Sequence, residues 1–140
     1  MTNSIYPCLW FDGQSKAAAD YYCSVFPNSK IISSNPMVVI FELNGTKFMG
    51  LNGGPDYKFN EAVSFVVNCE TQDEIDMYWN KLTEGGKEGK CGWLKDKFGI
   101  SWQIVPSILG KLMSDPEKAP KVMYAFMQMK KFDIEKLKEA

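Results

Sequence analysis

The sequence predicts an α+β protein in which one βαβββ plan occurs twice and is followed by short helices. Hydrophobic periodicity gives the order strand, helix, strand, strand, strand over residues 5–54 and again over 61–106. The break falls at Gly53-Gly54-Pro55-Asp56, and residues 107–140 have helical spacing. We expect a single domain, residues 1–140, because a chain of 140 residues can bury a core without disulfides or a structural metal.

The first module is expected to contain strands at 5–11, 30–33, 37–43 and 46–51, with a helix at 14–26. The first strand is rich in aromatic and apolar residues and ends at the turn-forming pair Asp12-Gly13. Apolar residues then recur at helical spacing until Pro27-Asn28. The pair Asn44-Gly45 between two alternating segments is typical of a two-residue β-hairpin.

The second module is expected to contain strands at 62–69, 87–91, 92–97 and 100–105, with a helix between the first two. Thr71 and Glu74 have the spacing of a capping box, in which each side chain bonds the other residue's backbone N–H. Gly85-Gly86 ends the helix and Pro106 ends the last strand. This order repeats the first module without obvious sequence identity.

Three short helices are expected at 108–113, 120–130 and 133–139, the last with Asp133 as its N-cap. Met and Phe residues face more than one side of the middle helix, at Met123, Phe126, Met127 and Met129. We favour a helix that packs on the core or on a second subunit over a cofactor-binding segment, because Met and Phe commonly fill gaps in cores.

Composition excludes several classes of function. The chain has 16 Lys+Arg, 17 Asp+Glu and no His, so it is not a basic nucleic-acid binder and cannot use imidazole as a base or metal ligand. Apolar runs stay well short of a membrane span, and Met1-Thr2-Asn3-Ser4 lacks a leader pattern, so we expect a cytoplasmic protein without membrane contact. The four cysteines (Cys8, Cys23, Cys69 and Cys91) form no Cys-x-x-Cys pair and are expected to be reduced, buried thiols.

Several segments together resemble the vicinal oxygen chelate superfamily, which includes glyoxalases, bleomycin-resistance proteins and extradiol dioxygenases. The resemblance is strongest to its PhnB-like branch, whose members often carry the name 3-demethylubiquinone-9 3-methyltransferase. It rests on Pro7–Gly13, Ala18–Tyr22, Phe48–Gly54, Ser64–Asn68, Cys91–Gly99 and Ser101–Pro106. These segments span nearly the whole chain.

The resemblance implies a curved eight-stranded mixed sheet built from both modules, with helices on its convex face and a ligand cleft in its concavity. It also implies a homodimer. Metal-dependent relatives hold a divalent ion through two His and two Glu, and the matching positions fall near Tyr6, near Ala62, within 46–51 and at Gln103. Since these positions carry no His, Cys or acidic residue, we expect no metal and no other cofactor.

The expected ligand contacts come from the strand faces that, as the resemblance implies, line the cleft. Tyr6, Cys8 and Trp10 alternate onto one face of the first strand, and Ser101 and Gln103 onto one face of the last. Asn52 and Trp93 are expected as their neighbours, whereas Trp102 alternates away and is expected in the core. Such rings and amides suit a planar or aromatic small molecule.

Asp12, Glu42 and Asp96 are interpreted as a turn residue or helix cap, a solvated strand end and a turn residue, respectively. We find no pair of carboxylates whose spacing indicates acid–base catalysis.

We therefore favour a metal-free homodimeric small-molecule binding protein over an enzyme. The alternatives are a metal-independent or weakly metal-dependent lyase, isomerase or transferase, with Cys8 as nucleophile or Tyr6 as acid, and a metal-dependent lyase or dioxygenase. A methyltransferase site requires a Gly-rich turn between strand and helix, and the Gly pairs at 53/54 and 85/86 lie elsewhere.

Overall fold

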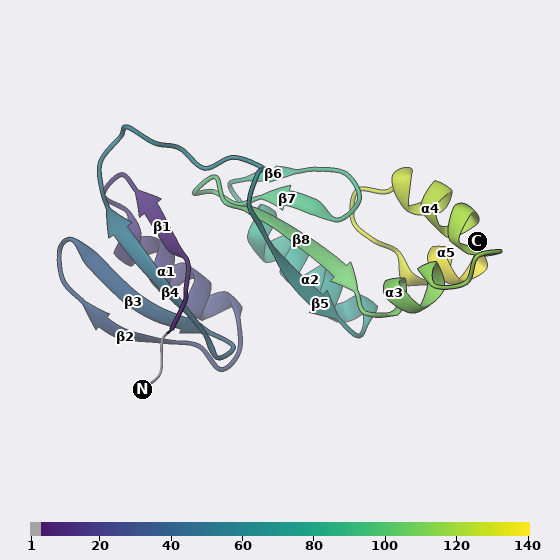
Figure 1. Cartoon of the computed structure of the whole chain (residues 1–140), viewed down its shortest axis with the longest axis horizontal. Helices are drawn as coiled ribbons and strands as arrows, with labels where there is room; N and C mark the ends of the chain where they lie inside the picture. The colour runs from purple at the N-terminus through teal and green to yellow at the C-terminus, as the bar shows by residue number, and fades with distance from the viewer. Residues whose placement is uncertain (1–3) are drawn as a thin grey trace. The chain divides into compact units, whose positions relative to one another are not determined.

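The computed structural model describes residues 4–140, and Figure 1 shows the order of their elements. The expectation of no leader concerns Met1-Thr2-Asn3-Ser4, of which only Ser4 lies within this range. The chain divides between Phe59 and Asn60 into two compact units, each with its own four-stranded mixed sheet. Both βαβββ modules are thus confirmed; the expectation that they form a single domain stays a prediction. Within residues 4–140, every helix is too short or too polar to cross a membrane.

The first unit contains β1 (Cys8–Phe11), α1 (Ser15–Val25), β2 (Lys30–Ser34), β3 (Val38–Leu43) and β4 (Thr46–Asn52). Its strand order is β1-β4-β3-β2, with β1 parallel to β4 and the remaining pairs antiparallel. Helix α1 lies against one face of this sheet, where Tyr22 is buried and stacks on Phe41. The predicted hairpin is confirmed: Asn44 and Gly45 both have positive φ, 49° and 86°, as a tight two-residue turn requires.

The second unit repeats this topology with β5 (Ser64–Cys69), α2 (Gln72–Thr83), β6 (Lys87–Glu88), β7 (Trp93–Lys95) and β8 (Ser101–Pro106). Its strand order is β5-β8-β7-β6, again with one parallel pair, β5 with β8. The predicted capping box forms at the start of α2, where Thr71 Oγ1 accepts from the Glu74 N–H and the Glu74 carboxylate accepts from the Thr71 N–H. Equivalent strands therefore occupy equivalent places in both sheets.

The C-terminal segment of the second unit contains α3 (Ile108–Met113), α4 (Ala119–Met127) and α5 (Ile134–Glu139), with Asp133 as the predicted N-cap. Residues 129–134 fasten it to the module. The N–H groups of Cys91 and Gly92 donate to the carbonyls of Met129 and Lys130. The Gln72 amide donates to the Phe132 carbonyl at 2.9 Å and accepts from the Ile134 N–H at 2.8 Å. These bonds hold α4 and α5 beside the second sheet.

Two sequence-based expectations were wrong in detail. The strand predicted over 87–91 is only two residues long, because Cys91 adopts a left-handed φ of 57° in the turn that leads to β7. The expectation of buried thiols fits only Cys69; Cys8 is exposed, and Cys23 and Cys91 are half-buried. Cys8 is exposed because strand alternation turns it to the face of β1 opposite Leu9, which lies in the core. All four cysteines are free thiols.

Candidate ligand-binding faces of the two sheets

Each sheet has one face packed on its helix and one face turned away from it. In the first sheet, Leu9 and Phe11 alternate into the core with Val39 and Phe41. The other face carries Cys8 and Trp10 of β1, with Met49 and Leu51 opposite them on β4 and Val38 and Ile40 on β3. Most of these side chains are half-buried. This face is apolar, with one large aromatic ring at its edge.

Trp10 is held in place by the segment that follows β4. Its indole Nε1 donates to the Gly54 carbonyl at 2.8 Å, and its ring meets the Tyr57 ring edge-on with centroids 5.0 Å apart. A Cβ at Gly53 would collide with the indole, so this position requires glycine. The Trp10 ring is therefore held in one position at the edge of this face.

The remaining predicted residues of the first unit have different surroundings. Tyr6 precedes β1, and the Lys47 ammonium lies 4.2 Å from the centre of its ring, a cation–π contact. Partial burial raises the pKa of the Cys8 thiol, which lowers its thiolate content at neutral pH.

The Asn52 amide bonds the protein backbone on both sides. Its oxygen accepts from the Ser15 N–H at 2.9 Å at the start of α1, and its nitrogen donates to the Pro36 carbonyl at 3.0 Å. Asn52 thus caps the start of α1, a role for which the sequence offered Asp12 as one alternative.

In the second sheet, the structure brings Trp93, Ser101 and Gln103 onto one face. Trp93 lies opposite Gln103, and Ser101 lies opposite Lys95. The Gln103 amide donates to the Ser64 hydroxyl at 3.0 Å. Trp102 points to the other face and is buried, as predicted. This face combines a half-buried indole with neutral polar groups.

A cavity of about 270 Å³ opens on this face, bordered by residues of β6, β7 and β8 together with Glu61. Lys95 forms an ion pair with Glu61, which lowers the pKa of that carboxyl group chiefly through their hydrogen bond. Ser101 is only 1% exposed, and its hydroxyl has no hydrogen-bond partner within residues 4–140. A buried polar group without a partner is uncommon in native structures and calls for an explanation.

The sequence indicated Trp93 and Ser101 but not the charged residues of this cavity, Glu61, Lys87, Glu88 and Lys95. Alternation within β7 could have placed Lys95 on the Trp93 face. The pairing of Lys87 with Lys95 depends on register, which the short β6 does not reveal in the sequence.

Asp96 was interpreted as an ordinary turn residue, but it is 3% exposed and bonds the structure around it. One carboxylate oxygen accepts from the Phe98 and Ile100 N–H groups, and the other accepts from the Trp102 indole at 2.8 Å. Its role is to hold the turn between β7 and β8 against the core.

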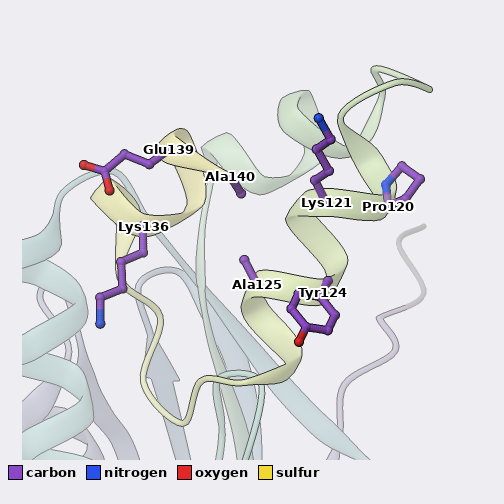
Figure 2. Close-up of a pocket in the computed structure, with 7 residues that line it drawn as sticks. All are labelled: Pro120, Lys121, Tyr124, Ala125, Lys136, Glu139 and Ala140. Atoms are coloured by element: carbon purple, nitrogen blue, oxygen red, sulfur yellow. The ribbon is translucent and has the colours of Figure 1, made fainter.

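A second cavity, of about 570 Å³, lies between α4 and α5 (Figure 2). Pro120, Lys121, Tyr124 and Ala125 come from α4, and Lys136, Glu139 and Ala140 from α5 or its end. Figure 2 shows Lys121, Lys136 and Glu139 extending outward from the helices. No sequence pattern indicated this cavity.

The residues at the superfamily's metal positions do not fit a divalent ion. Tyr6 contacts Lys47, Ala62 has no donor side chain, and the Gln103 amide is bonded to Ser64. Within residues 4–140, the structure contains no group of three or more His, Cys, Asp or Glu side chains arranged to hold a metal. We therefore derive no chemical step through a metal.

The sequence model of a family described as 3-demethylubiquinone-9 3-methyltransferase matches residues 3–105. The chain belongs to this family. It is 31% identical to a putative 3-demethylubiquinone-9 3-methyltransferase, PhnB protein, from Bacillus cereus; the match covers 75% of this chain and 100% of that one, with a TM-score of 0.69. No curated protein sequence matches this chain.

Two more distant structures share the fold. A glyoxalase-related enzyme from Fulvimarina pelagi is 15% identical over 77% of this chain and 91% of that one, with a TM-score of 0.56. The fosfomycin resistance protein FosX from Listeria monocytogenes is 12% identical over 75% and 91%, with a TM-score of 0.55. The predicted PhnB-like family is thus confirmed by the family match, and these two structures show a likeness of fold alone.

Proposed function

We propose that this chain is a metal-free, homodimeric, cytoplasmic protein that binds a planar or aromatic small molecule against the open faces of its sheets. The observation that carries the proposal is the face shared by Trp93, Ser101 and Gln103, on which Trp93 and Ser101 border a cavity together with charged residues. A ligand pocket of this kind combines an apolar surface with a few fixed polar groups. We further propose that the two units act together as one domain and that Tyr6 and Trp10 add aromatic surface.

Two features support the assembly and compartment in this proposal. β1 and β5 are each one of the two outer strands of their sheets, and an outer strand offers backbone groups to a second chain. Four free cysteines accord with a reducing compartment. Analytical ultracentrifugation should give twice the chain mass, and a monomer at every concentration would contradict the dimer.

Catalysis is the weaker candidate. The raised pKa of Cys8 argues against a nucleophilic thiolate. The strand-to-helix connections, Asp12-Gly13-Gln14 and Glu70-Thr71, are not Gly-rich, so we do not propose the methyl transfer that the family description names.

The test is a tryptophan-fluorescence titration with a panel of planar metabolites and antibiotics. We expect a saturable response that is lost in Gln103→Ala and strongly reduced in Trp93→Ala. Trp93→Phe should restore part of it because a ring remains. Gln128→Ala, an exposed glutamine at the end of α4, is the matched control and should bind normally. Equal affinity in Gln103→Ala, Trp93→Ala and the unaltered chain would refute the proposed site.

A further inference from the structure

We propose that the cavity on the second sheet takes an aromatic carboxylate, with its ring against Trp93 and its carboxylate over the row formed by Lys87, Lys95 and Ser101. This inference rests on the proposed function and specifies the chemical class of its ligand. It is argued from strand register, from the charges around the cavity and from the unpartnered hydroxyl.

The register of the second sheet places the relevant groups in two adjacent rows. Lys87 on β6 lies opposite Lys95 on β7, and Lys95 lies opposite Ser101 on β8. Trp93 and Gln103 form the next row, two residues along. Since neighbouring strands are about 4.8 Å apart, the two rows together cover an area of the sheet that matches one small molecule.

The charges around the cavity favour an anion. Lys87 and Lys95 lie directly opposite each other, and like charges in that position repel. Glu61 pairs with Lys95, whereas Lys87 has no ion-pair partner within residues 4–140. Glu88 also borders the cavity, but alternation turns its side chain to the face opposite that of Lys87. One positive charge on the open face is therefore left without a counter-charge.

Ser101 supplies the second polar contact. Ser101 borders the cavity, and its hydroxyl is buried and has no hydrogen-bond partner within the described chain. A serine hydroxyl can donate one hydrogen bond, and a carboxylate oxygen is a strong acceptor for it. A carboxylate would thus satisfy Ser101 and Lys87 at once, while the half-buried Trp93 offers the apolar surface for a ring.

Other ligand classes match these groups less well. A cation would meet the ammonium groups of Lys87 and Lys95, and the one carboxylate facing them, Glu61, is already paired. A neutral ring would leave Lys87 uncompensated. At about 270 Å³ the cavity is near the lower end of the range for small-molecule pockets, which suits a ligand of one or two rings.

The test compares 2-naphthoate with 2-naphthamide, which has the same shape without the charge. Binding to the full-length protein is measured by following backbone amide signals in NMR titrations. We expect naphthoate to bind about tenfold or more tightly than naphthamide, because hydrogen bonds to charged groups are the stronger ones. The affected amides should include those of Lys87, Trp93 and Ser101.

Two variants test the contacts. Ser101→Ala and Lys87→Gln should each weaken naphthoate binding about tenfold while changing naphthamide binding little. Ser15→Ala is the matched serine control, because Ser15 is also buried with an unpartnered hydroxyl but lies in the first unit. Lys111→Gln on α3 is the matched lysine control. Both controls should bind naphthoate normally.

The possible failures can be told apart. If planar compounds bind through Trp93 and Gln103 but naphthoate has no advantage over naphthamide, or Ser101→Ala and Lys87→Gln leave it unchanged, the carboxylate assignment is overturned and the proposed function stands. If neither naphthalene compound nor any member of the planar panel binds, both are overturned. Lys87 is exposed on the outer strand, so its variant gives a result even if Ser101→Ala folds poorly.

Discussion

The buried carboxylate of Asp96 gives a sharp test of how the second unit is held together. In Asp96→Asn the oxygen can still accept from the Phe98 and Ile100 N–H groups, but the amide nitrogen then faces the Trp102 indole N–H. Two donors cannot bond each other, so the buried indole N–H is left unsatisfied, at a cost of about 1–3 kcal/mol. Asp96→Ala also removes the partner of the buried Ile100 N–H, and two such groups together cost roughly 2–6 kcal/mol.

The assay is urea denaturation followed by far-UV circular dichroism, with the free energy of unfolding taken from the midpoint and slope. Trp102→Phe removes the indole N–H, so Asp96→Asn should cost much less in that background than in the unaltered chain. An equal cost in both backgrounds would show that the indole bond is not the cause. No loss of stability in Asp96→Asn would refute the whole account of this carboxylate.

Three further predictions concern other places in the chain. Gly53→Ala should destabilise the first unit by about 1–3 kcal/mol, because the new methyl group meets the Trp10 indole. In a Trp10→Ala background most of that loss should disappear. An unchanged free energy of unfolding for Gly53→Ala in urea denaturation would disprove the contact. The Lys131 ammonium bonds Asp76 and lowers the pKa of that carboxyl group. The contribution of this ion pair to the free energy of unfolding is therefore present above the ordinary pKa of about 4 and is lost as pH falls through the lower folded-state pKa. As a surface pair it should amount to at most about 1 kcal/mol, and Asp76→Asn should remove this part of the pH dependence of stability. Burial raises the pKa of Cys69 to about 11, so iodoacetamide at neutral pH should modify this thiol only when the protein unfolds. Fast labelling of Cys69 itself in the folded protein, located by peptide mass spectrometry, would contradict its burial.

The elements themselves were largely predictable. The capping box at Thr71 and Glu74 and the Asn44-Gly45 hairpin each depend on residues within a few positions of one another, so local sequence suffices to specify them. The sequence predicted β6 too long, because the residue type of Cys91 does not indicate that its backbone adopts a left-handed φ.

The candidate site was predictable only in part. Alternation put Ser101 and Gln103 on one face, and the structure agrees. Strand alternation could not show that the Asn52 amide is bonded to backbone groups on both sides, nor that Trp10 is held by Gly53 and Gly54.

The sequence by itself determined the order of strands and helices, their duplication and the face on which each strand residue lies, because these follow from spacing along the chain. Only the tertiary structure decided which residues stand opposite one another. Gln103 bonds Ser64 across 39 positions, and the cavity that joins Lys87, Glu61 and the unpartnered Ser101 depends on the register of separate strands. Register is set by the packing of whole strands against a core, so the charges of the cavity and its unpartnered hydroxyl become visible only when the sheet is formed.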